Sequence, residues 1–409
     1  MKNRIVVFGL LITLSLMSIG GNLVFAEETT VEEAETVSEE LLSEEEATED
    51  EVLELSLQEA IDYALENSKD MEIERLELLK AEVIYKDNIR AVEDLEDNPS
   101  SIRLREPGII SDIGPAIPDA TVNRALVKNG AMRLSIELGY NVAKWNVEMK
   151  ENQVKYNIEK AYFDILQVEK ELEISEENLS LAKKQHEHGK LRYELGMISQ
   201  QQLLALEFNL SQAQSGYDSA NMYYELQRMS FKNTIGMPLD REFGLTGSIE
   251  YMEYEPIDLE KSIKSALENN GGILISKDNY EYSRLRLEAI SARYPDITFR
   301  YREQAAEVAK ADKNLETALV GAEMQVRSAV LNLTTAEKQI ATFEKAVYQA
   351  SEGVRIAELS FELGQSTPTE VAQANLNLMN AKKNLAQQIH AFNMALLDYK
   401  YSIGIGKGF

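Results

Sequence analysis

The sequence predicts an all-α protein with little or no β-structure, in which a long, coiled-coil-like helical-hairpin unit occurs twice in tandem. Three observations predict this fold class. Glycine and proline number only 21 and 8 among 409 residues, which favours long, uninterrupted helices. Similar stretches recur in the same order at fixed offsets, which indicates an internal duplication. Apolar residues recur at steps of three and four, the spacing of a helical packing seam.

The first 26 residues have the pattern of a signal peptide. Lys2 and Arg4 give a positive start, residues 5–17 form an apolar run, and Val-Phe-Ala at 24–26 places small residues at a cleavage site. An uncleaved membrane anchor is the alternative, because the apolar stretch continues weakly to residue 26. Under both interpretations the bulk of the chain is exported to the cell envelope or beyond it.

Residues 27–54 are expected to form a disordered acidic tether. This stretch contains 14 acidic residues and no basic one, which is about half of the net charge of −27. Like charges repel, and the apolar surface is too small to offset the entropy of ordering. The negative charge of the whole chain also argues against nucleic acid as a partner. With no cysteine, the chain has no disulfides, thiolate metal sites or cysteine nucleophiles.

The two copies are expected to span residues 55–240 and 257–406. Ala-Leu-Glu-Asn at 64–67 corresponds to the same four residues at 266–269, an offset of 202. Tyr-Glu-Leu-Gly at 193–196 corresponds to Phe-Glu-Leu-Gly at 361–364, an offset of 168. The first copy therefore carries 34 extra residues between these two anchors.

Each copy is expected to contain one long helix and two shorter ones. The predicted helices lie near 57–95, 120–195 and 200–234, and near 259–293, 301–363 and 368–402. In both copies the long helix nearly equals the two shorter ones together, so the short helices should stack end to end along it. At about 1.5 Å per residue the long helices would span roughly 90–110 Å.

A tight turn between the second and third helices is predicted in both copies. A glycine closes the long helix, as a left-handed C-cap residue does. A hydroxyl residue follows three positions later, and a Gln or Glu three positions after that, which is the spacing of a capping box. The six residues that define these two tips are Gly196, Ser199, Gln202, Gly364, Thr367 and Glu370.

These motifs, duplicated in order over residues 55–406, resemble the TolC family of outer membrane efflux proteins. The motifs are the repeated Ala-Leu-Glu-Asn, the stretch Ala-Tyr-Phe-Asp-Ile-Leu at 161–166, the two tips, and Arg-Tyr-Pro-Asp-Ile at 293–297, which matches the family's helix-to-strand junction. The resemblance implies a homotrimer that encloses a helical conduit for efflux. The tips would meet a periplasmic adaptor, or membrane-fusion protein, of an inner-membrane pump. Helix capping without a partner is the alternative for the six tip residues.

The breaks between the first and second helices depart from the family pattern. Members that cross an outer membrane insert a β-hairpin at each break, and a spanning strand needs ~9–11 residues. The break at 294–300 is too short, and the break at 97–119 contains four prolines. Residues 133–142 alternate in polarity, but the surrounding spacing favours a helix. We therefore expect a variant without the membrane-spanning hairpins, and a non-channel cell-envelope scaffold is the alternative function.

The sequence offers no catalytic, cofactor or metal-binding constellation, so an enzyme is not expected. His186 and His188 are two positions apart and point to different faces of a helix, and His390 is isolated. All three histidines are expected to be solvated. The glycine-rich stretch at 404–408 has no helix after it and is expected to be a frayed terminus.

Overall fold

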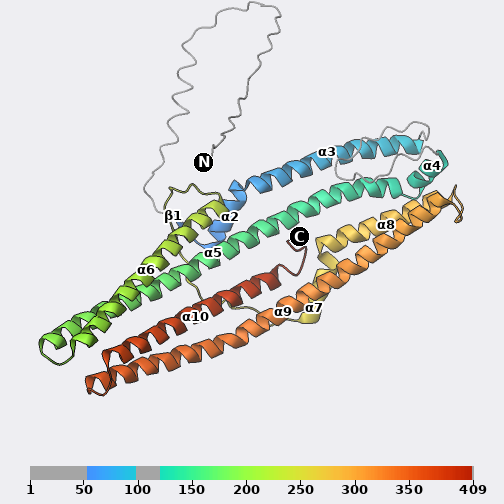
Figure 1. The fold of residues 1–409 in the computed structure, drawn as a ribbon. Coiled ribbons are helices and arrows are strands. Elements are labelled where there is room, and N and C mark those ends of the chain that lie inside the picture. The colour runs from blue at the N-terminus through green and yellow to red at the C-terminus, as the bar shows by residue number, and fades with distance from the viewer. Residues whose placement is uncertain (1–52, 98–119, 408–409) are drawn as a thin grey trace, which may run out of the picture. The chain divides into compact units, whose positions relative to one another are not determined.

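The computed structural model describes residues 53–97 and 120–407, which are drawn in colour in Figure 1. The predicted signal peptide, the break at 98–119 and most of the predicted acidic tether lie outside the described residues. The described part of the chain is almost entirely helical, which confirms the predicted fold class.

The elements follow one another in two similar series. The first copy, together with the short strand on either side of it, contains β1 (Leu53–Leu55), α2 (Leu57–Asn67), α3 (Lys69–Asp97), α4 (Ala120–Lys128), α5 (Ala131–Glu194), α6 (Gln200–Ile235) and β2 (Phe243–Leu245). The second copy contains α7 (Leu259–Asn269), α8 (Gly271–Ser291), α9 (Phe299–Glu362) and α10 (Pro368–Lys400). Residues 133–142 lie inside α5, so the helical interpretation of that stretch is correct.

The first predicted helix of each copy is in fact two helices. In the first copy, Ser68 separates α2 from α3, and its hydroxyl accepts a hydrogen bond from the Met71 N–H at 3.3 Å. In the second copy, Asn270 separates α7 from α8, and its Oδ1 accepts a hydrogen bond from the Ile273 N–H at 3.2 Å. These side chains cap the first turn of the helix that follows, as Ser and Asn commonly do. A third break, at Gly130 with φ of 81°, separates α4 from the long α5.

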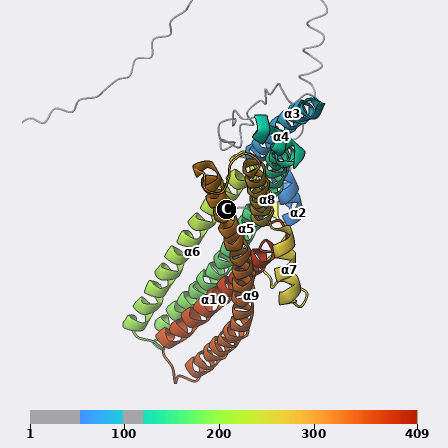
Figure 2. The same ribbon diagram turned by 90° about the vertical axis from the view of Figure 1, so that its right-hand side faces the viewer.

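The long helices α5 and α9 organise the packing. Towards the two tips, the helices lie side by side in the order α6, α5, α10 and α9, and towards the opposite end the order is α3, α5, α8 and α9 (Figures 1 and 2). The short helices thus stack end to end along the long ones, as predicted. Helices α5 and α9 have 64 residues each, so they run for about 95 Å.

A two-stranded parallel sheet joins the start of the first copy to its end. Leu53 pairs with Phe243 and Leu55 with Leu245. The sequence pattern did not predict these strands, and Leu53 and Glu54 belong to β1 rather than to the acidic tether in which they were placed. The sheet lies over the main apolar core, where Phe231 and Phe243 are buried with their ring centroids 5.3 Å apart.

The junction between α8 and α9 is a compact turn. Residues 292–298 contain no strand, as the short break predicted. Within residues 53–97 and 120–407, none of the helices has both the length and the apolar character that a membrane crossing requires.

The C-terminal segment is docked rather than frayed, so that prediction is wrong for residues up to Lys407. The Ile405 carbonyl accepts from the Gly271 N–H at 3.0 Å, and the Gly406 carbonyl accepts from Asn152 Nδ2 at 2.8 Å. Lys407 Nζ lies 3.2 Å from the centroid of the Tyr156 ring. The Asn152 and Tyr156 contacts hold the end of the second copy against α5 of the first copy, and the Gly271 contact holds it against the start of α8.

Candidate partner-docking tips

The long helix of each copy ends in the same hydrogen-bonded turn. In the first tip, the Gly196 N–H donates to the Tyr193 carbonyl at 2.9 Å and the Met197 N–H to the Arg192 carbonyl at 2.8 Å. In the second tip, the Gly364 and Gln365 N–H groups make the equivalent bonds, at 3.0 and 2.8 Å. Both glycines have positive φ, at 71° and 74°. This is the Schellman arrangement, in which the left-handed residue lets the chain turn back.

The predicted capping boxes are present at the start of the next helices. The Gln202 N–H donates to Ser199 Oγ at 3.3 Å, and the Ser199 N–H donates to Gln202 Oε1 at 2.8 Å. Thr367 and Glu370 make the same reciprocal pair at 3.3 and 2.7 Å. Two backbone donors at each of these helix starts are therefore satisfied within the turn.

The two tips lie next to each other at one end of the described unit (Figure 1). The Arg192 guanidinium carbon, from α5, lies 4.2 Å from the ring centroid of Phe361, from α9. Around this contact, Leu195, Met197 and Leu363 are all exposed. The structure thus brings all six predicted tip residues to one surface, which also carries apolar side chains suited to docking a partner. Partner binding by these residues stays a prediction.

The second tip is expected to lose capping stability in acid, whereas the first is not. Hydrogen bonds from the Thr367 backbone N–H, and then from the Ser366 and Thr367 hydroxyls, hold the pKa of Glu370 below its ordinary value of 4.5. A lowered native pKa stabilises the fold above the unfolded-state pKa, and this contribution is lost as the pH falls through the native pKa. In the first tip, Gln202 does not titrate.

Thermal unfolding of the Glu370→Gln variant, followed by circular dichroism, checks this expectation. The variant should be less stable than the parent at neutral pH, and the difference should shrink as the pH falls through the lowered pKa of Glu370. Gln202→Glu is the matched control, because it should introduce the same pH dependence at the first tip. A difference between parent and Glu370→Gln that stays the same from neutral to acidic pH would contradict the prediction.

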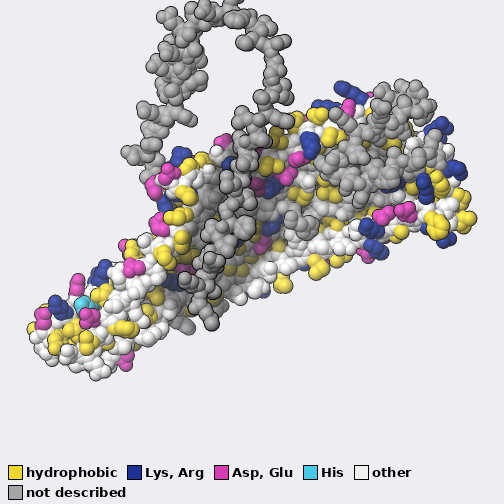
Figure 3. Space-filling view, turned by 45° about the horizontal axis from the view of Figure 1, so that its top comes forward, with side chains coloured by type: hydrophobic (Ala, Val, Ile, Leu, Met, Phe, Trp, Pro, Cys, Tyr) yellow, Lys and Arg dark blue, Asp and Glu magenta, His cyan; other side chains and the backbone are white. Residues whose placement is uncertain are grey.

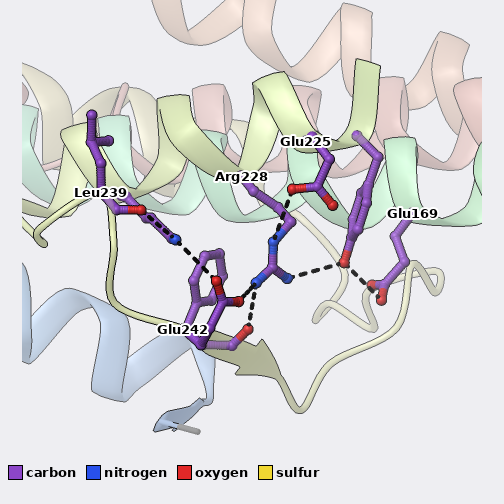
Figure 4. Close-up of polar contacts among 8 residues, drawn as sticks. Glu169, Glu225, Arg228, Leu239 and Glu242 are labelled. Carbon is purple, nitrogen blue, oxygen red and sulfur yellow. Dashed lines mark hydrogen bonds and ion pairs between the residues drawn. The ribbon is translucent and has the colours of Figure 1, made fainter. Parts of the chain in front are cut away.

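Arg228 is an important residue that the sequence pattern left unexplained. It lies on α6 in the row of mostly apolar residues that recur every three or four positions, where the second copy has Leu396. Its Nη2 donates to Glu242 Oε2 at 2.9 Å and to the Phe243 carbonyl at 3.0 Å, and its guanidinium carbon lies 4.5 Å from the Phe243 ring centroid (Figure 4). Arg228 therefore holds the segment after α6 against the helix and positions β2 for pairing with β1.

His390 is not a solvated side chain, so that part of the sequence prediction is wrong. It is partly buried between the copies, and its Nε2 lies 2.7 Å from Asp164 Oδ1 on α5. Burial alone raises the pKa of Asp164, but the hydrogen bond to His390 and the charge of Lys160 hold that pKa below its ordinary value. The contact is a polar link between α10 and α5, and His186 and His188 take no part in it.

The described residues contain no cluster of three or more histidine and carboxylate side chains that could hold a metal ion. The carboxylates instead lie in ion pairs along the helices, such as Lys80 with Glu77 and Arg327 with Glu323, at 3.0 and 2.8 Å. These are solvated pairs at helical spacing, which contribute little to stability. They give the rods a polar surface.

Large apolar side chains are exposed along the outer helices of the unit. On one edge they come from α3 and α6: Ile73, Leu76, Leu79, Val83, Leu204, Phe208, Met222, Leu226 and Met229. On the opposite edge they come from α9: Val320, Met324, Leu331, Tyr348 and Ile356. In the packing order described above, α3 and α6 form one open edge and α9 forms the other. We call these the α3/α6 edge and the α9 edge.

Comparison with known proteins identifies the fold. No protein-family model and no curated protein matches the chain in sequence. Among solved structures, the outer membrane protein VceC from Vibrio cholerae superposes with a TM-score of 0.65 and 15% identity, over 86% of this chain and 97% of that one. The CmeC outer membrane channel from Campylobacter jejuni gives 0.64 and 13%, over 86% and 87%. The outer-membrane channel OprN gives 0.64 and 12%, over 86% and 90%.

These matches confirm, at the level of fold, the resemblance to the TolC family that the duplicated motifs indicated. They span both copies and nearly the whole length of the matched proteins. The described chain therefore has the fold of the TolC-type outer membrane channels.

Proposed function

We propose that this protein is the conduit component of an efflux system, exported to the cell envelope and assembled as a homotrimer. The observation that carries the proposal is the channel fold, shared over 86% of the chain with VceC. Transport through such a conduit is passive. An adaptor protein and an inner-membrane pump would supply the substrate and the energy, and they would approach from the end that carries the two tips.

The two open edges support assembly into a closed ring. Each edge exposes a row of large apolar side chains, which a monomer would leave in contact with water. The edges belong to opposite sides of the wall of helices, so the α3/α6 edge of one copy can pack on the α9 edge of the next. Such a head-to-tail contact between identical chains forms a ring when its rotation closes. A ring of curved walls encloses a central passage.

A pair of cysteine substitutions tests this assembly directly, because the chain has no cysteine of its own. Phe208 on α6 and Ile356 on α9 are both exposed and lie about two turns from their tips. In a ring with its axis along the rods, the two positions should come level at each contact between neighbours. Oxidation of the Phe208→Cys/Ile356→Cys double variant should therefore give disulfide-linked dimers and trimers on a denaturing gel, and no larger species.

The single variant Phe208→Cys is the control, and it should give no disulfide-linked species larger than a dimer. Light scattering and negative-stain imaging of the unmodified protein complete the test, with a hollow trimeric rod as the expected result. A monomer at all concentrations would overturn the proposal, because one copy cannot enclose a passage. The protein would then be interpreted as an envelope scaffold that keeps the fold without the channel.

A further inference from the structure

The turn between α8 and α9 holds two apolar side chains in solvent, at the end of α9 opposite the tips. Phe299 is 91% exposed and Ile297 is 74% exposed, the two highest values among the large apolar residues described. Phe299 is the first residue of α9, whereas the second tip follows its last residue. The pair therefore marks the far end of a rod about 95 Å long.

Hydrogen bonds within the turn keep these side chains on the outside. The Thr298 N–H and hydroxyl both donate to the Pro295 carbonyl, at 2.9 and 2.7 Å. The Thr298 hydroxyl also caps α9 by accepting from the Tyr301 N–H at 3.4 Å. The backbone on both sides of Thr298 is thus fixed, so Ile297 and Phe299 cannot fold back onto the helices without breaking the cap. Their exposure is built into the turn.

Positive charge surrounds the two apolar side chains. Residues 293–303 contain three arginines, at 293, 300 and 302, and two acidic residues, at 296 and 303, in a chain whose net charge is −27. Arg300 and Arg302 are exposed, and within the described residues neither has a carboxylate partner: Arg300 Nη1 donates to Tyr294 Oη at 3.3 Å, and Arg302 Nε donates to the Asp296 carbonyl at 3.4 Å.

The neighbouring α4 extends the positive surface. Residues 120–136 contain three basic residues and no acidic one, and α4 packs on α8. Figure 3 shows Lys and Arg side chains around a group of hydrophobic ones at the right-hand end. The basic residues counted here belong to α4, the start of α5 and the α8–α9 turn. We call this surface the basic end.

The size and chemistry of the basic end favour a lipid surface over a protein. A stable protein interface buries about 800 Å² on each partner, far more than two side chains at a turn provide. Shallow insertion into lipid headgroups needs only a few apolar side chains flanked by arginines that attract anionic lipids. We propose that the α8–α9 turn inserts Ile297 and Phe299 into the interfacial region of an anionic bilayer, while Arg300 and Arg302 bind lipid phosphates.

A fluorescent label at the turn tests this proposal in the full-length protein. The Ile297→Cys variant would carry an environment-sensitive dye on its single cysteine. With vesicles of phosphatidylcholine and phosphatidylglycerol, its emission should shift to the blue and be quenched by nitroxide-labelled lipid. With phosphatidylcholine alone both changes should be weak. Leu363→Cys, labelled in the same way at the tip, is the matched control because it is similarly exposed, and it should show neither change.

The arginines are tested in the same assay. The double variant Arg300→Gln/Arg302→Gln should bind the anionic vesicles more weakly, by about 5-fold for each charge removed. Its circular dichroism should match that of the parent, since both side chains are exposed. The local label separates insertion of the turn from any binding through the N-terminal apolar segment. An Ile297 label that stays in water, a tip label that responds equally, or full binding by the arginine variant would each overturn the proposal.

Discussion

Replacing Phe392 with alanine is expected to lower the free energy of unfolding by about 3–5 kcal/mol. Phe392 has no exposed surface and is the centre of the second core cluster. Its ring stacks on Tyr251 at a centroid distance of 4.4 Å and lies 5.9 Å from Tyr254. Truncation therefore removes both the burial of the ring and the packing that attaches the segment after β2 to α9 and α10.

Urea denaturation of the parent and the variant measures this effect. Phe299→Ala is the matched control, since it removes the same ring from a position that is 91% exposed. In the absence of lipid, the control should change the free energy of unfolding by no more than about 0.5 kcal/mol. Similar losses in both variants would show that Phe392 is not the packing centre that its burial indicates.

Replacing Lys400 with methionine is expected to cost about 2–3 kcal/mol, although the lysine side chain itself is largely exposed. Lys400 Nζ donates to Glu159 Oε1 at 2.6 Å, and only 4% of the Glu159 side chain is exposed. The substitution would leave a buried carboxylate without its cation, which is the costly way to break an ion pair. Burial and the Glu159 charge raise the pKa of Tyr401, so its hydroxyl stays protonated, but an uncharged hydroxyl cannot replace the lost cation.

The double variant Glu159→Gln/Lys400→Met separates the ion pair from the packing of the lysine chain. Removing both charges should recover most of the lost stability, because no buried charge is then left unpaired. The two single variants and the double variant form a thermodynamic cycle, measured by urea denaturation. If the double variant is less stable than Lys400→Met alone, the unpaired Glu159 is not the cause of the loss. The pair joins α5 of the first copy to α10 of the second.

The long helices could be predicted well from the sequence because their signals are local. The helix predicted at 301–363 is observed at 299–362, and both tips have the turn geometry that their glycines and capping residues indicated. Caps and apolar periodicity act within a few residues, so a linear pattern contains them. The break at Asn270 was missed because the apolar spacing continues across it, although Asn is itself a capping residue.

The features that the sequence did not predict depend on distant partners. β1 has three residues, too few for a strand pattern, and it forms only because Phe243 and its neighbours lie alongside it. Arg228 takes a seam position where the second copy has a leucine, and its role follows only from its partners, the Phe243 carbonyl and the Glu242 carboxylate. His390 and the glycines near the C-terminus were assigned to solvent, and their partners, Asp164 and Asn152, are more than 220 positions away.

The pairing of β1 with β2 has a consequence for the order of folding. Leu53 is 190 positions from its partner Phe243, so β1 remains unpaired until more than half of the chain has been synthesised. The hairpins α5–α6 and α9–α10 have no such requirement, because the two helices of each hairpin are joined by a short turn and pack on each other directly. Local contacts form faster than distant ones. The C-terminal hairpin, although made last, can therefore close within itself, whereas the N-terminal copy is completed only when its own end returns to its beginning.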